Sequence, residues 1–106
     1  MEIRQKLSTG DSRFKILVVD DHPNTAHMLA RALSRLGPHV DVASATSGLE
    51  ALQRVEEEPV DILITDLMMP EMNGVELIET LNNQPSLSPA ATFLLTAYDS
   101  TVVRVS

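Results

Sequence analysis

Four short apolar segments, each followed by a segment with helical spacing, constrain the fold of this chain most strongly. The first apolar segment, residues 16–19, is a continuous run that stops abruptly at Asp20 and Asp21. Uninterrupted apolar runs of this length are typical of strands buried on both faces, as in a parallel sheet. The later runs cover residues 40–43, 60–65 and 91–96. The pattern therefore predicts four buried or half-buried strands.

The segments between these runs predict helices. Residues 23–36 carry apolar side chains at helical spacing, and Gly37 and Pro38 end that helix. A second helix is expected from a cap at Thr46 or Ser47, a third over residues 75–81, and a fourth from a cap at Asp99 or Ser100. Strands that alternate with helices in this way predict a parallel sheet with right-handed crossovers and helices on both faces.

Length and charge limit the class of protein. The 106 residues suit a single domain, and the formal net charge of −7 disfavours a nucleic-acid or anionic membrane surface. The absence of cysteine excludes disulfides and thiolate metal sites. No stretch approaches the roughly 20 apolar residues needed to span a bilayer, and a cytoplasmic protein is the simplest interpretation.

Oxygen-bearing side chains stand where three of the predicted strands end. These are Asp20 and Asp21 after the first strand, Asp66 after the third, and Thr96 at the end of the fourth. Ligands bind open parallel sheets beyond this edge, and crowded carboxylates repel one another unless a cation neutralises them. Such a cluster suits Mg²⁺ or Mn²⁺, beside which an Asp can act as a nucleophile toward phosphorus.

An ordinary structural role is the alternative, because a single Asp at such a position most often caps a helix or belongs to a turn. Spacing alone leaves the two interpretations equally open. His22 could touch this site, but a solvated loop residue is the expected outcome. Met69 and Met72 are expected to fill gaps beneath the loop that follows Asp66.

Three segments resemble response-regulator receiver domains. They are Leu-Val-Val-Asp-Asp-His-Pro at 17–23, Asp-Leu-Met-Met-Pro-Glu-Met-Asn-Gly at 66–74, and Leu-Leu-Thr-Ala at 94–97. They occur in the order and at the separations found in that family. The resemblance implies a flavodoxin-like, doubly wound parallel sheet and a phosphoacceptor regulatory domain of a two-component system. Such a domain catalyses only its own phosphorylation and dephosphorylation.

The resemblance also implies roles for individual residues. Asp66 would accept a phosphoryl group, and Asp20, Asp21, Asp66 and the main-chain carbonyl of Met68 would hold Mg²⁺. Thr96 would hydrogen-bond the phosphoryl group as a switch residue, and Pro70 and Gly74 would shape the loop after Asp66. The partner would be a sensor histidine kinase or a histidine phosphotransfer protein.

The end of the sequence departs from the family pattern. Receiver domains have a fifth strand that ends in a phosphate-pairing Lys, and then a fifth helix. We expect neither here, so that residues 1–14 form a polar leader and residues 15–106 a receiver domain truncated after its fourth strand. Residues 91–96 would then be an unpaired edge. The chain would associate with copies of itself through this strand or through the first helix, or it would be poorly stable.

Three other classes of function are alternatives to a phosphoacceptor domain. A receiver-like interaction or dimerisation module without phosphorylation is the main alternative. A phosphohydrolase with an Asp nucleophile commonly has a second Asp two residues later, where this chain has Met68. A nucleotide or flavin domain is disfavoured because no Gly-rich phosphate loop follows the first strand.

Overall fold

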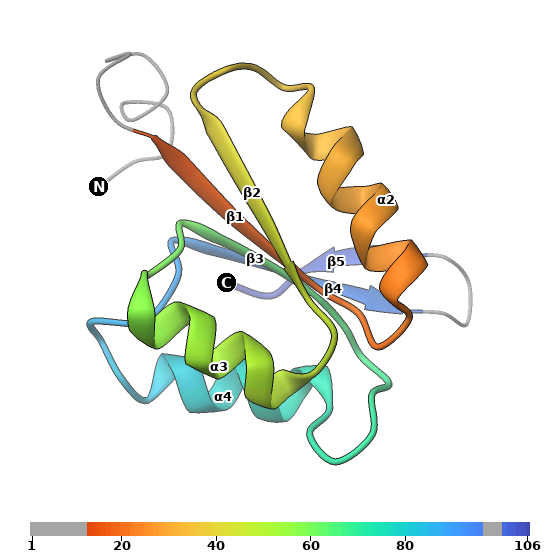
Figure 1. Ribbon diagram of the computed structural model, residues 1–106. Helices are drawn as coiled ribbons and strands as arrows, with labels where there is room; N and C mark the ends of the chain where they lie inside the picture. The colour runs from red at the N-terminus through yellow and green to blue at the C-terminus, as the bar shows by residue number, and fades with distance from the viewer. Residues whose placement is uncertain (1–12, 97–100) are drawn as a thin grey trace.

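A five-stranded sheet forms the centre of the molecule (Figure 1). The structure is a computed structural model, and it describes residues 13–96 and 101–106. The strand order is β2-β1-β3-β4-β5, and the first four strands run parallel, as the sequence predicts. The strands are β1 (Phe14–Val19), β2 (Val40–Ala45), β3 (Ile62–Asp66), β4 (Ala91–Thr96) and β5 (Thr101–Arg104).

Helices cover both faces of this sheet. The described helices are α2 (Pro23–Ser34), α3 (Gly48–Glu57) and α4 (Gly74–Asn82). Figure 1 shows α2 on one face and α3 beside α4 on the other. The doubly wound α/β fold that the alternation predicts is therefore confirmed.

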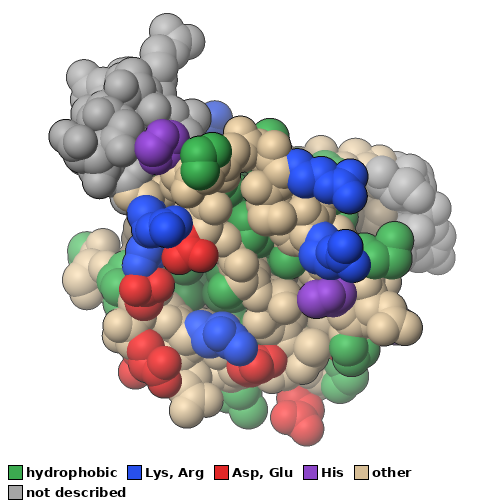
Figure 2. Space-filling model, turned by 45° about the horizontal axis from the view of Figure 1, so that its top comes forward, with side chains coloured by type: hydrophobic (Ala, Val, Ile, Leu, Met, Phe, Trp, Pro, Cys, Tyr) green, Lys and Arg blue, Asp and Glu red, His purple; other side chains and the backbone are tan. Residues whose placement is uncertain are grey.

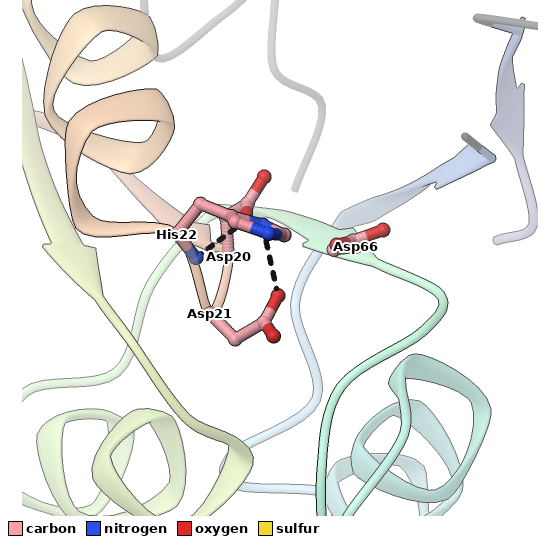
Figure 3. A group of neighbouring side chains, drawn as sticks. All are labelled: Asp20, Asp21, His22 and Asp66. Carbon is pink, nitrogen blue, oxygen red and sulfur yellow. Dashed lines mark hydrogen bonds and ion pairs between the residues drawn. The ribbon is translucent and has the colours of Figure 1, made fainter.

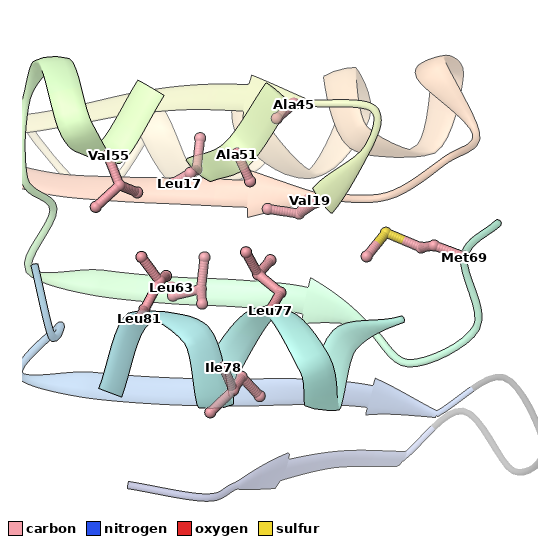
Figure 4. Close-up of a cluster of buried hydrophobic side chains, with 10 residues drawn as sticks. All are labelled: Leu17, Val19, Ala45, Ala51, Val55, Leu63, Met69, Leu77, Ile78 and Leu81. Carbon is pink, nitrogen blue, oxygen red and sulfur yellow. The ribbon is translucent and has the colours of Figure 1, made fainter. Parts of the chain in front are cut away.

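Two apolar clusters fill the space between sheet and helices. The larger lies beneath α3 and α4 and is aliphatic, apart from Met69 (Figure 4). The smaller packs Phe14, Ile16 and Val18 against α2. Alternate residues of β1 thus face opposite layers, and Leu17 and Val19 belong to the larger cluster. This two-sided burial explains why the sequence of β1 is apolar without alternation.

Side-chain caps fix where α3 and α4 begin. The Ser47 hydroxyl accepts the main-chain N–H of Glu50 at 3.0 Å, so Ser47 is the cap of α3. Asn73 and Glu76 form a reciprocal capping box at the start of α4, with distances of 2.9 and 3.0 Å. Because each cap satisfies N–H groups that the helix itself leaves unpaired, these short polar segments set the helix starts.

The expected fourth helix, capped at Asp99 or Ser100, is wrong. Those two residues lie outside the described part of the chain, but Thr101–Arg104 form β5, which pairs antiparallel with β4. Thr101, Val102 and Val103 are β-branched, a composition that favours strand over helix. The expectations of a sheet without a fifth strand and of an unpaired β4 are therefore also wrong. Val102 and Val103 remain 56% and 42% exposed.

Two buried threonines on neighbouring strands differ in their hydrogen bonding. Both Thr65 and Thr92 are 0% exposed. The Thr65 hydroxyl donates to the Asp66 carbonyl at 3.0 Å, whereas the Thr92 hydroxyl has no partner among the described residues. A buried hydroxyl without a partner has lost its hydrogen bonds to water without replacing them.

We therefore predict opposite effects of the same substitution at these two positions. Thr92→Val should leave the free energy of unfolding unchanged or raise it by about 1 kcal/mol, because it removes an unsatisfied group. Thr65→Val should lower the free energy of unfolding by roughly 1 kcal/mol, because it removes a made hydrogen bond. Urea denaturation measures both, and an equal loss in the two variants would contradict the prediction.

Candidate functional site

Four side chains with possible ligand atoms meet at the carboxyl edge of the sheet. They are Asp20, Asp21, His22 and Asp66, and their candidate ligand atoms all lie within 4.8 Å of one another (Figure 3). The register of the sheet explains the convergence. Val19 of β1 pairs with Thr65 of β3, so the next residue of each strand, Asp20 and Asp66, arrives at the same place. The predicted meeting of the three aspartates is confirmed.

Burial makes this cluster electrostatically costly. Asp20 and Asp66 are only 5% and 9% exposed. Burial raises the pKa of Asp66 above its usual value, and the charges of Asp20 and then Asp21 raise it further. Main-chain hydrogen bonds from Met68 and Leu67 oppose that rise. The site thus holds carboxylates that a nearby cation would stabilise in their charged form.

One oxygen of Asp21 lacks a hydrogen-bond donor in the described part of the chain. This oxygen, Oδ1, is buried and accepts no hydrogen bond, although Nδ1 of His22 lies 3.2 Å away. That ring nitrogen lies closer to Oδ1 of Asp20, at 3.1 Å, and Asp20 also accepts the main-chain N–H of His22 at 2.9 Å. Since Nδ1 carries at most one proton, it serves Asp20 and leaves Asp21 without a donor. An orphaned carboxylate oxygen fits a hard divalent cation such as Mg²⁺.

His22 is solvated, as the sequence predicts, with a side chain that is 73% exposed. Its Nδ1 nevertheless contacts two carboxylates, so that His22 is solvated and also touches the site. The hydrogen bond to Asp20, followed by the charges of Asp21 and Asp20, raises the pKa of His22. The position of His22, directly after the acidic pair, was the signal for this contact.

The loop after Asp66 is held against the site by close main-chain packing. Gly74 donates its N–H to the Leu67 carbonyl at 2.9 Å. A Cβ at Gly74 would overlap the carbonyl oxygen of Asp66 and lie 2.9 Å from Cδ1 of Leu94. Only glycine therefore lets α4 start this near the end of β3. This close approach is the physical reason why Gly74 shapes the loop, as the sequence leads us to expect.

Two of the three methionines of this loop, Met69 and Met72, pack as the sequence predicts. Met69 is 8% exposed within the larger core, and Met72 packs against that core from the side. A Cβ at Gly48, the first residue of α3, would lie 2.8 Å from the sulfur of Met72. The loop is thus anchored to α3 through a flexible side chain and to β3 through main chain.

Thr96 and Met68 lie near the site without belonging to the cluster of acidic side chains. Thr96 is the last residue of β4, and its hydroxyl lies 3.3 Å from the Thr101 carbonyl of β5. Its pairing with Thr101 of β5 replaces the helix expected after Thr96. Met68 follows Asp66 by two residues, and its side chain is 69% exposed.

Comparisons with known proteins agree with this geometry. The family model of the response regulator receiver domain matches residues 16–106. The chain is 38% identical to the sensor protein EvgS of Escherichia coli K12, over 84% of this chain and 8% of that protein. It is 37% identical to the alkaline phosphatase synthesis transcriptional regulatory protein PhoP of Bacillus subtilis, over 86% of this chain and 36% of that protein. The chain thus spans only a fraction of these relatives.

Solved structures of receiver domains have a similar fold. A response regulator receiver protein domain from Methanoculleus marisnigri superposes with a TM-score of 0.73 at 34% identity, covering 81% of this chain and 68% of that one. The Francisella response regulator 1452 receiver domain superposes with a TM-score of 0.69 at 30% identity, covering 84% and 70% of the two chains.

The fold and its acidic edge define a regulatory domain of the two-component class. The chain belongs to the response regulator receiver domain family. Among the residues that the structure describes, no helix is long and apolar enough to span a membrane.

Removing the charge of Asp66 should stabilise the protein when no divalent cation is present. We predict that Asp66→Asn raises the free energy of unfolding at neutral pH by on the order of 1 kcal/mol in EDTA, because it relieves repulsion among crowded, buried carboxylates. With Mg²⁺ the difference should shrink or reverse, since the wild type gains more from binding the ion. Glu79→Gln, an equal charge change at an exposed residue of α4, is the control and should have little effect. Urea denaturation that finds Asp66→Asn destabilised in EDTA would contradict this account.

The two close glycines provide a matched pair of alanine substitutions. Gly74→Ala should lower the free energy of unfolding by roughly 2–4 kcal/mol, because its Cβ meets main chain that cannot yield cheaply. Gly48→Ala should cost less, because its Cβ meets the side chain of Met72, which can change rotamer. Thermal and urea unfolding measure both variants, and a smaller loss for Gly74→Ala would show that the main-chain contact does not constrain the loop.

Proposed function

We propose that the chain is a signalling switch that accepts a phosphoryl group on Asp66 from a phosphohistidine donor in a Mg²⁺-dependent reaction. One observation carries the proposal. A buried carboxylate at the end of β3 stands beside two carboxylates that follow β1, in a domain of the receiver family. Within the chain, the receiver domain would begin at Phe14, the first residue of β1, which is one residue before the boundary expected from the sequence, and residues 1–13 would form a leader.

The transfer forms one bond and breaks another. An oxygen of the Asp66 carboxylate attacks phosphorus, the P–N bond of the donor phosphohistidine breaks, and its electron pair remains on the imidazole nitrogen. The product is an acyl phosphate on Asp66. Mg²⁺, when bound, offsets the charge of the carboxylates and of the transferring group.

The chain's own residues position this reaction. The main-chain N–H groups of Met68 and Leu67 favour the charged form of the Asp66 carboxylate and so lower its pKa. The Leu67 N–H also donates to the Leu95 carbonyl at 3.0 Å, which ties the loop after Asp66 to β4. Asp20 and Asp21 would hold the ion together with Asp66, and the main-chain carbonyl of Met68 would complete the protein ligands. The unpartnered, buried Oδ1 of Asp21 supports this assignment.

Thr96 would act as the switch residue. Its position at the end of β4, next to the strand that ends at Asp66, supports this role. Its hydroxyl lies 3.3 Å from the Thr101 carbonyl, so binding the phosphoryl group requires that contact to be exchanged. The phosphorylated state would therefore rearrange the connection between β4 and β5, because a new dianion reorders nearby donors.

The main alternative is a receiver-like interaction module that is not phosphorylated. The observation that favours it is the position of Arg104, the cation of β5. Arg104 pairs with Phe93, three residues before Thr96, so β5 directs it away from the carboxyl edge of the sheet. The phosphate-pairing Lys of the family has no counterpart in β5. Phosphorylation of the chain therefore discriminates between the two functions.

The proposal includes a sensor histidine kinase or a histidine phosphotransfer protein as partner, and a cytoplasmic location. It includes no turnover of an external substrate. It also includes no direct contact with nucleic acid, which the net charge of −7 supports. Basic and acidic side chains lie mixed over much of the face in Figure 2, in place of the basic surface that phosphate backbones require.

A phosphorylation assay tests the proposal. The protein is incubated with phosphoramidate and Mg²⁺, and the mass increase of a phosphoryl group is measured on intact protein. We expect labelling of the wild type, none of Asp66→Asn, and loss of labelling in EDTA. Asp41→Asn, an exposed aspartate on the edge strand β2, should label like the wild type. A labelled Asp66→Asn variant would exclude Asp66 as acceptor, and an unlabelled wild type would favour the interaction module.

A further inference from the structure

The acidic site contains one nitrogen atom that a magnesium site does not need. Nδ1 of His22 lies 3.1 Å from Oδ1 of Asp20 and 3.2 Å from Oδ1 of Asp21, and all three belong to the group of candidate ligand atoms that includes Asp66. Figure 3 shows the ring of His22 turned toward the carboxylates and not away from them. The imidazole therefore occupies part of the surface that would face a cation held by these carboxylates.

These separations match neighbouring ligands around one ion. Adjacent ligands of an octahedral ion with bonds of about 2.1 Å stand ~3.0 Å apart. Around a tetrahedral zinc ion with bonds of about 2.0–2.1 Å they stand ~3.3–3.4 Å apart. The observed 3.1 and 3.2 Å fall between these values. One ion that displaces the proton from Nδ1 of His22 could thus contact Asp20, Asp21 and His22 with little movement of the side chains.

The chemistry of the ligand atoms then determines which ion binds more strongly when His22 takes part. Mg²⁺ prefers oxygen and retains its water, so an imidazole adds little to its binding. Zn²⁺, Ni²⁺ and Co²⁺ accept imidazole nitrogen readily and bind nitrogen and oxygen sites more strongly than Mg²⁺-type ions do. The chain has no cysteine, so no thiolate competes for these metals.

We propose that His22 is an additional protein ligand of the acidic site and gives it a preference for imidazole-binding divalent cations, of the Zn²⁺, Ni²⁺ and Co²⁺ type, over Mg²⁺. The inference rests on the same cation site as the proposed function, but not on phosphoryl transfer. Its consequence is competition, since such an ion would occupy the carboxylates that the reaction needs. His22 is in this sense a residue that determines metal selectivity.

The test compares two metals on three proteins. Untagged wild type, His22→Asn and His27→Asn are titrated with Ni²⁺ and, separately, with Mg²⁺ by isothermal calorimetry. His22→Asn retains the main-chain N–H that Asp20 accepts, and His27, an exposed residue of α2, is the matched control. We expect His22→Asn to weaken Ni²⁺ binding about 10- to 100-fold, the range for groups that support a metal site, with Mg²⁺ affinity nearly unchanged. His27→Asn should behave as the wild type.

A spectroscopic readout complements the titration. The visible absorption of bound Co²⁺ depends on its ligands, so its band should shift in His22→Asn and remain in His27→Asn. Unchanged Ni²⁺ affinity in His22→Asn, or an equal loss for Ni²⁺ and Mg²⁺, would overturn the inference. Phosphorylation that proceeds with Mg²⁺ while His22 has no effect on Ni²⁺ leaves the proposed function intact. Ni²⁺ binding through His22 in a protein that is not phosphorylated would support the inference about His22 and contradict the proposed function.

Discussion

Repulsion among carboxylates at the carboxyl edge of the sheet is the constraint on which the rest of this structure depends. Asp20 and Asp66 are almost fully buried, and their ligand atoms lie within 4.8 Å of each other and of Asp21 and His22. A fold retains such a group only if surrounding packing supplies more stability than the charges remove. The aliphatic layers on both faces of β1 and β3 provide that packing.

The same packing fits the proposed role of the site as a switch. Gly74 brings α4 against the main chain of Asp66, while Met69 and Met72 fasten the intervening loop to the core. A charge added at Asp66 would therefore act on elements that already touch it. At the end of β4, the contact between the Thr96 hydroxyl and the Thr101 carbonyl is weak enough in geometry to exchange. Fixed packing on one side and an exchangeable contact on the other are what a two-state response requires.

The sequence predicts the parallel part of the sheet and the acidic edge because both follow from local patterns. Apolar runs that end in Asp place carboxylates at one edge whenever the strands are parallel neighbours. The strand at 101–104 could not be predicted in the same way, since a short β-branched segment pairs only if a partner strand offers an edge. The contact of His22 with Asp20 and Asp21 was expected only as the alternative to a solvated loop residue. The position of His22 after the acidic pair places it near the site, but the contact depends on the rotamer of one exposed side chain.

Anomalous diffraction from crystals soaked with Mn²⁺, a hard ion that substitutes for Mg²⁺, tests the central claim most directly, because it locates the cation without relying on activity. The account predicts one strong anomalous peak within about 2.0–2.4 Å of carboxylate oxygens from Asp20 or Asp21 and from Asp66. A peak elsewhere on the molecule, with no Mn²⁺ at these three carboxylates, would contradict it.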